Sequence, residues 1–244
     1  MSVVYWSVFQ PSGLDYFLNI EEPRSVISYA SNLSTSGDPL IGFMNCPAFL
    51  NNAMLTYNIE SPINYSVMWD GLSFNTWHSD TDFLEKNTVV RSMDKGVFSF
   101  LPPQLIFFTG DESMDMLFSG GHYSTSDFSS KVNVMSGMFD IGKWFRPTDC
   151  TFIFKNKNDP VIINRGDVVS SVRFFPADKK KVVLKRFYMN DNLLRLSNAF
   201  ISHKNFNDNS NYNIMQYFDN VTKNVSRLGI KKQILREIKN NLMD

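Results

Sequence analysis

The chain has 244 residues, a formal net charge of zero at pH 7 and 22 phenylalanines. This length supports one large domain or two small ones with a substantial core, and the aromatic content favours pleated β structure over a disordered chain. Cys46 and Cys150 lie far apart and outside any metal-binding spacing, so we expect two free thiols in a reducing compartment. With no basic-then-apolar leader and no run of about 18 apolar residues, neither secretion by a signal peptide nor a membrane span is expected.

Short apolar or alternating segments, separated by turn residues, dominate the first part of the chain. Val3–Gln10 predicts a strand, and Met54–Ile59 alternates cleanly between apolar and polar residues. The dipeptide Asp70-Gly71 favours a hairpin between Asn64–Trp69 and Leu72–Trp77. The chain therefore begins as a series of short strands.

The same pattern continues to about residue 190. Asp94-Lys95-Gly96 predicts a turn between Thr88–Met93 and Val97–Phe100, and Pro102-Pro103 predicts a break or an edge position because proline cannot donate to a ladder. Further strands are expected at Gln104–Thr109, Met114–Phe118, Val132–Met135, Thr151–Phe154, Val161–Ile163, Val168–Phe175 and Lys181–Tyr188. Strands this close, without helices between them, predict a mainly β fold, an antiparallel β-sandwich or jelly-roll-like barrel.

Helical periodicity replaces alternation at about Asp191. Asp191–Ile201 predicts a short helix, and Asn205–Asn211 predicts a polar loop. Two apolar stripes with helical spacing follow: Ile214, Phe218, Val221, Val225 and Leu228, then Ile230, Ile234, Ile238 and Leu242. We therefore divide the chain into an antiparallel β domain (1–190) and a helical C-terminal segment (191–244). This segment either packs on the β domain or is used for self-association.

Charge is divided unevenly between the two ends of the chain. From Ala177 to Asp244 there are 13 Lys and Arg against 6 Asp and Glu, a balance of +7, so the preceding 176 residues carry −7. A basic end can attract an acidic partner surface or nucleic acid. The alternative is a solvated helical face, and we do not expect a nucleic-acid partner.

One segment carries a pattern typical of metal sites. His78-Ser79-Asp80 places a histidine and a carboxylate on one face of a strand, and His122 can supply a third ligand from a later strand. Neutral imidazole and carboxylate suit Fe(II). Against this hypothesis, His-x-Asp is a frequent pattern, and no arginine follows His122 as an anion anchor; the basic residue placed near is Lys131. Two surface histidines without a metal are the alternative, and iron analysis of protein purified without chelator distinguishes the two.

The segment at residues 138–154, MFDIGKWFRPTDCTFIF, places charged residues among aromatics. An exposed Trp144-Arg146 pair, with Lys143 beside it, can stack on a sugar or base or anchor a partner protein. The alternative is a corner in which Trp144 and Phe145 pack inward. Trp144, Arg146 and Lys143 are our candidates for partner or ligand binding.

Another turn is predicted within VIINRGDVVSSVRFFP, residues 161–176. This segment predicts two strands joined by a turn at Arg165-Gly166-Asp167. Glycine and aspartate suit tight turns, so we interpret the triplet as turn chemistry rather than a cell-adhesion motif.

The chain resembles a group of uncharacterised proteins encoded by tailed marine phages, in four segments: CPAFLNNAMLTYNIESPINYSV (46–67), PPQLIFFT (102–109), FDIGKWFRP (139–147) and INRGDVVSSVRFFP (163–176). The resemblance spans most of residues 40–190, and FDIGKWFRP is its most specific part. The group has no established activity, so the resemblance implies no catalytic or binding residue. It implies a viral source and a protein that acts in the cytoplasm of an infected bacterial host or in the virion.

Two functional classes follow from these observations. We expect a non-catalytic binding or structural/assembly module, without a cofactor, that binds a partner protein, a glycan or a second copy of itself. The alternative is a non-haem Fe(II) oxygenase that uses His78, Asp80 and His122.

Overall fold

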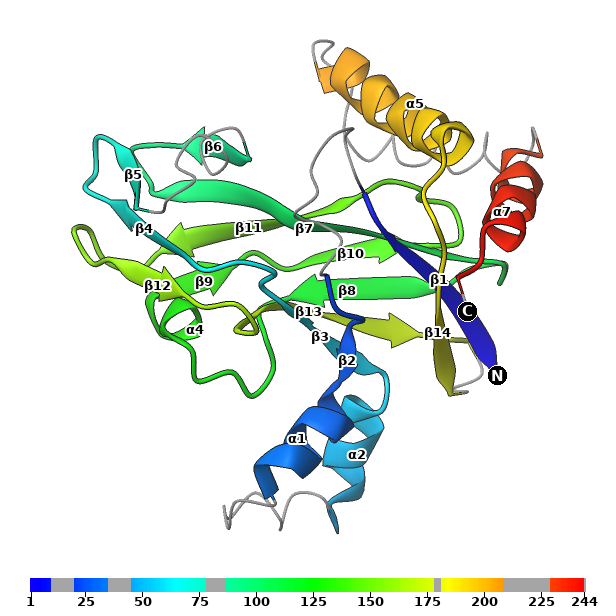
Figure 1. Cartoon of the computed structure of the whole chain (residues 1–244), viewed down its shortest axis with the longest axis horizontal. Helices are drawn as coiled ribbons and strands as arrows, with labels where there is room; N and C mark the ends of the chain where they lie inside the picture. Colours follow the sequence, from blue (N-terminus) through cyan, green and yellow to red (C-terminus); the bar gives the residue numbers. More distant parts are fainter. Residues whose placement is uncertain (10–19, 35–44, 78–86, 178–180, 209–228, 244) are drawn as a thin grey trace.

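The structure is a computed structural model that describes residues 1–9, 20–34, 45–77, 87–177, 181–208 and 229–243. Within these residues the strands form three sheets (Figure 1). The six-stranded sheet contains β14 (Val182–Arg186), β1 (Ser2–Val8), β7 (Val97–Thr109), β11 (Thr148–Phe154) and β9 (Val132–Val134), with β6 (Thr88–Ser92) also paired to β7. The five-stranded sheet contains β10 (Gly137–Asp140), β8 (Asp115–Ser119), β13 (Val168–Phe175), β3 (Thr56–Glu60) and β2 (Arg24–Ser25). The three-stranded sheet contains β12 (Val161–Ile163), β4 (Tyr65–Trp69) and β5 (Phe74–Trp77).

The prediction of a mainly β fold built from antiparallel sheets is confirmed, although the described strands do not close into a barrel. Both predicted hairpins form, and their turns contain Gly71 and Gly96 at φ values of +100° and +64°. Asp70 fixes the first turn, where its side chain accepts hydrogen bonds from Ser73 Oγ and from the backbone of Leu72 and Ser73. These bonds lower the pKa of Asp70 to about 2.

Side-chain alternation along β7 places two cores on opposite faces of the six-stranded sheet. Phe98 and Phe107 belong to the main core, which also contains buried residues of the five-stranded and three-stranded sheets, such as Phe174 and Tyr65. The main core therefore lies between packed sheets. Ile106 and Phe108 point to the other face, as expected for successive residues of a strand.

Five helices accompany the described strands: α1 (Val26–Ser34), α2 (Pro47–Ala53), α4 (Asp127–Lys131), α5 (Asp191–Asp208) and α7 (Ile230–Asn240). The second core joins α5 and α7 to the six-stranded sheet through ten buried residues: Phe9, Ile106, Phe108, Trp144, Phe145, Phe187, Leu193, Phe200, Ile234 and Ile238. Among the described residues, no helix is long and apolar enough to cross a membrane.

Three details of the predicted secondary structure are wrong. Helices α1, α2 and α4 lie among the strands, and residues 205–208, predicted as loop, belong to α5. β1 pairs with β14 in parallel rather than antiparallel. β7 continues through Pro102-Pro103 without a break, and the prolines take the predicted edge position. The prolines fall between the segment that pairs with β6, which ends at Phe100, and the segment that pairs with β1, which begins at Leu105. On the other side of β7 the register of β11 shifts between Leu105 and Phe100, so no regular ladder requires the missing N–H groups.

The two cysteines differ in accessibility, and this difference gives a first test of the fold. Cys46 is exposed and Cys150 is buried, and both are free thiols. Burial, and then the charge of Asp149, raises the pKa of the Cys150 thiol to about 12. We expect one thiol per chain to react rapidly with a thiol reagent at neutral pH, and the second to react only as the protein unfolds. Cys46→Ser should remove the rapid phase alone, whereas rapid reaction of both thiols would contradict the fold.

Candidate functional site

One face of the five-stranded sheet is polar, and it carries the candidate site. Arg24 lies opposite Asn58, Asn58 lies opposite Ser171, and Ser171 lies opposite Ser119. Directly paired residues share a face of the sheet, so these four side chains form a polar row across β2, β3, β13 and β8. The next residue of β13, Val172, points to the main core instead.

Asn58 connects this polar face to the loop after β8. Its side chain is fully buried, donates through Nδ2 to the His122 carbonyl at 2.9 Å, and accepts from the His122 backbone N–H at 3.1 Å. The same loop is tightly packed, because a Cβ added to Gly121 would lie 2.4 Å from Cγ1 of Val168. The loop that carries His122 is therefore held in one position.

A pocket of about 390 Å³ lies at the β2–β3 end of this face. Its lining comes from three separate parts of the chain: Glu21, Arg24, Tyr29, Glu60, Ser61, Pro62, Arg165 and Gly166. β3 and β13 are antiparallel neighbours, so the segment after β3 and the turn before β13 meet at the same end of the sheet. This register builds the pocket wall from Ser61-Pro62 and from Arg165-Gly166.

Arg24 is held on one side of the pocket by two carboxylates. Its guanidinium is hydrogen-bonded to Glu21 and lies 3.5 Å from Oε1 of Glu60. The hydrogen bond with Glu21, followed by the charge of Glu60, raises the pKa of Arg24. Burial raises the pKa of Glu60; Arg24 opposes this shift and Glu21 adds to it. The positive charge of Arg24 is thus already balanced within the protein.

Arg165 enters the pocket from a rigid turn. Its backbone N–H donates to Asn64 Oδ1 at 2.6 Å, and the N–H of Gly166 donates to the Ser61 carbonyl at 2.9 Å. Gly166 has a φ of +90°, which favours glycine. Arg165 is exposed and makes no ion pair with any other residue that the structure describes. The pocket therefore combines a neutralised arginine with an available one.

The proposed metal ligands are only partly described. His78 and Asp80 lie outside the described residues, so the triad with His122 stays a prediction. The His122 ring is half-buried, and burial, followed by the charge of Arg173, lowers its pKa. In the described ranges of the chain, no three His, Cys, Asp or Glu side chains are grouped so that they could hold a metal ion.

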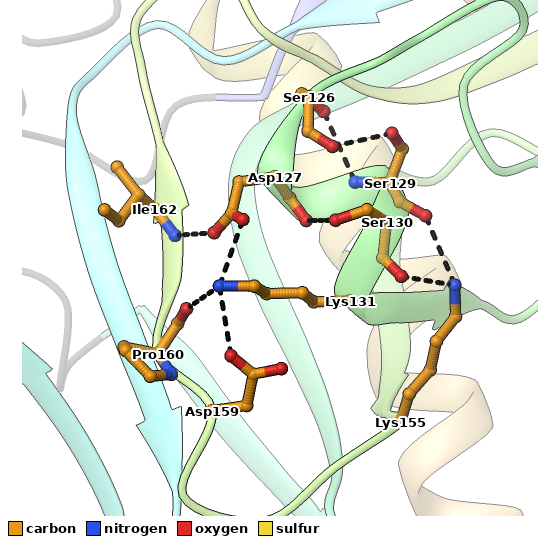
Figure 2. A network of polar contacts seen from close by, with 9 residues as sticks. All are labelled: Ser126, Asp127, Ser129, Ser130, Lys131, Lys155, Asp159, Pro160 and Ile162. Carbon is orange, nitrogen blue, oxygen red and sulfur yellow. Dashed lines mark hydrogen bonds and ion pairs between the residues drawn. The ribbon is translucent and has the colours of Figure 1, made fainter.

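Lys131, the candidate anion anchor near His122, binds carboxylates of the protein itself (Figure 2). Its Nζ lies 3.0 Å from carboxylate oxygens of both Asp127 and Asp159, and it donates to the Pro160 carbonyl. The hydrogen bonds with Asp127 and Asp159 raise the pKa of Lys131. Asp127 also accepts from the Ile162 N–H at 2.7 Å, so the network connects α4 to β12. Lys131 is therefore a structural residue, and the candidate anchor is not available.

The segment FDIGKWFRP forms a corner around Asp140. The Asp140 side chain accepts from the Gly142 N–H at 3.0 Å and lies 2.9 Å from Nζ of Lys143, while its carbonyl accepts from the Trp144 N–H. The Trp144 side chain is only 5% exposed and Phe145 is fully buried, so the predicted corner with both rings packed inward is confirmed and the alternative of an exposed Trp-Arg pair is not. The Arg146 guanidinium covers the Trp144 ring, 4.9 Å from its centroid. Binding by Arg146 or Lys143 stays a prediction.

Comparison with known proteins gives distant similarities only. No family model and no curated protein matches the chain. Among solved structures, a mutant dUTPase of Staphylococcus bacteriophage 80alpha shares 10% identity over 71% of this chain and 89% of its own, with a TM-score of 0.34. Another mutant of that dUTPase, with dUpNHpp, shares 11% identity over 50% of this chain and 70% of its own (TM-score 0.30). A mutant dUTPase from phage phi11 of S. aureus shares 12% over 50% and 76% (TM-score 0.29).

Sequence reasoning identified part of this pocket but not its function. The Arg165-Gly166-Asp167 turn, which forms one wall, was recognised from its residue types. Its proximity to Ser61-Pro62 depends on the pairing of β3 with β13, which periodicity alone does not specify. No sequence pattern marked Arg24 as a pocket residue, because its strand, β2, contains only two residues.

Proposed function

We propose that this chain is a binding module whose pocket at the β2–β3 end receives a carboxylate-bearing segment of a partner protein. The observation that carries the proposal is Arg165, a cation on a rigid turn that lines the pocket without an ion pair among the described residues. A guanidinium on a fixed backbone recognises a carboxylate in bidentate geometry, which gives both orientation and affinity.

The opposite wall explains why one acidic group fits better than a highly charged ligand. Glu21 and Glu60 both face Arg24, so with Arg165 the lining is formally neutral, and Arg165 is its cation without an ion pair among the described residues. A peptide segment presents a carboxylate and, within a few ångströms, backbone N–H groups that can donate hydrogen bonds to the Glu60 carboxylate. The pocket therefore matches an acidic peptide segment in both charge and hydrogen bonding. Action in an infected bacterial cell or in the virion remains part of this proposal.

Substitution of Arg165 tests the proposal. A fluorescently labelled glutamate-rich peptide should bind the wild-type chain, and Arg165→Ala should weaken the binding about 10- to 100-fold, because a charged hydrogen-bonded contact contributes about 1.5–3 kcal/mol. Arg165→Lys should restore only part of the affinity, since lysine keeps the charge but loses the bidentate geometry. Fluorescence anisotropy at fixed ionic strength measures each dissociation constant.

Lys95→Ala is the matched control, because Lys95 is an exposed cation in the β6–β7 turn and does not line the pocket. It should leave the peptide affinity unchanged. Equal affinity of wild type and Arg165→Ala, or no measurable peptide binding by the wild type, would overturn the proposal. So would a neutral oligosaccharide that binds the wild type in place of the peptide.

A further inference from the structure

A surface separate from the pocket lies on α7, at the side of the molecule (Figure 1). The helix buries Ile234 and Ile238 against the second core. Its exposed cations are Lys232, Arg236 and Lys239, whose spacings of four and three residues place them in one stripe. We call these three residues the basic stripe. The stripe and the half-buried Leu235 line a shallow hollow of about 410 Å³.

An acidic loop adjoins the first turn of the same helix. It joins β7 to β8 and presents Glu112 together with Asp115, the first residue of β8; both are exposed. We call Glu112 and Asp115 the acidic pair. The Lys231 ammonium donates to the Asp111 carbonyl, which fixes the start of α7 beside this loop. Leu235 lies next to the loop as well, because a Cβ added to Gly110 would be 3.7 Å from its Cδ1.

Burial lowers the pKa of the Lys231 ammonium, and the charges of Asp140, Asp111 and Glu112 oppose that shift, so Glu112 interacts with one cation of α7 without an ion pair. Neither the basic stripe nor the acidic pair forms an ion pair with another residue that the structure describes. The surface therefore combines a basic stripe around Leu235 with an acidic pair on the loop that adjoins the first turn of α7. Exposed groups of opposite sign that are adjacent but unpaired are suited to meet their complements on another surface.

We propose that this surface is a two-fold interface with a second copy of the chain. Rotation about an axis close to Leu235 places the acidic pair of each copy over the basic stripe of the other. An isologous interface requires such a self-complementary patch, in which each group meets its opposite. Leu235 then meets its own copy at the centre, and the charged groups surround it, as in an interface with an apolar core and polar rim. The interface is independent of Arg165 and the pocket.

Charge reversal tests the interface in solution. Sedimentation equilibrium of the wild type should show a dimer whose dissociation constant rises at least about tenfold as NaCl increases from about 50 to about 500 mM, because rim charges are screened by salt. Lys232→Glu/Arg236→Glu and Glu112→Lys/Asp115→Lys should each weaken the dimer at least about tenfold. Lys95→Glu, a reversal of an exposed cation away from this surface, should leave it unchanged.

Mixing the two double variants separates the two-fold interface from any general effect of charge. In the first variant both groups are acidic, and in the second both are basic, so an equimolar mixture restores both pairs of opposite charges. The mixture should form heterodimers with near wild-type affinity, while each variant alone is monomeric. A wild type that stays monomeric at low salt, or a mixture that stays monomeric, would overturn the proposal. Circular dichroism of each variant establishes that it is folded.

Discussion

Phe145→Ala should lower the free energy of unfolding by about 3–5 kcal/mol, the range for truncation of a buried phenylalanine. Phe145 is fully buried, and its ring meets Phe108 of β7 edge-on at a centroid distance of 5.3 Å. It also stacks on Phe187 at 6.5 Å and shares the second core with Ile234 and Ile238 of α7. Its removal leaves a cavity between the six-stranded sheet and the C-terminal helices. Urea denaturation followed by circular dichroism measures the loss.

Met138→Ala is the control for this prediction, because Met138 lies in the neighbouring β10 and its side chain is 57% exposed. It should change the free energy of unfolding by less than about 0.5 kcal/mol. Hydrogen exchange gives a second measurement: the amides of α7 should exchange faster in Phe145→Ala than in the wild type, since the helix packs through this core. A loss below about 1 kcal/mol for Phe145→Ala would contradict the packing described here.

The strands could be predicted because their signals are local. Val161–Ile163 and Val168–Phe175 were predicted with the bounds that the structure gives to β12 and β13. The hairpins were predicted from their turn residues, because glycine adopts the positive φ that such turns require. The apolar segment LIFF in β7 was also recognised as a strand. Its two faces fill different cores, which accounts for the absence of a polar residue at alternate positions.

The helices between the strands show where local reasoning failed. α2 begins at Pro47, and proline at the first helical position is a known start signal, but no helix was predicted here. The N-cap residue, Cys46, makes no capping hydrogen bond through its side chain, so the usual capping signal is absent. The parallel pairing of β1 with β14 joins residues about 180 positions apart. No periodic pattern specifies such a contact, because it depends on the whole topology.

The candidate site depends on the same non-local information. Its lining residues come from segments near positions 21–29, 60–62 and 165–166, which the register of β2, β3 and β13 brings together. The sequence left two roles open for Trp144, an exposed anchor beside Arg146 or a residue packed inward at a corner. In the structure the Trp144 side chain is buried in the second core, because α5 and α7 cover this face of the sheet. Burial by distant helices therefore decided the role of Trp144.

Gly96→Ala should be the most destabilising of the simple glycine substitutions in the turns, at about 2–4 kcal/mol. Gly96 has a φ of +64°, where a side chain costs about 1 kcal/mol. A Cβ at this position would also lie 2.7 Å from Cε3 of Trp69. The indole is only 5% exposed, and its Nε1 donates to the Met93 carbonyl at 2.7 Å, so the ring cannot move aside without losing a buried hydrogen bond.

Gly229→Ala separates the two causes, because Gly229 has almost the same φ, +69°, and, apart from its chain neighbours, no described residue has an atom within 4 Å of an added Cβ. It should therefore show the backbone cost alone, about 1 kcal/mol. The difference between the two variants, about 1–3 kcal/mol, isolates the overlap with Trp69, a typical cost of overpacking. Urea denaturation of both variants measures this difference under the same conditions. Equal losses would mean that the Trp69 ring is not fixed against the β6–β7 turn, and the tight packing at this end of the main core would then be wrong.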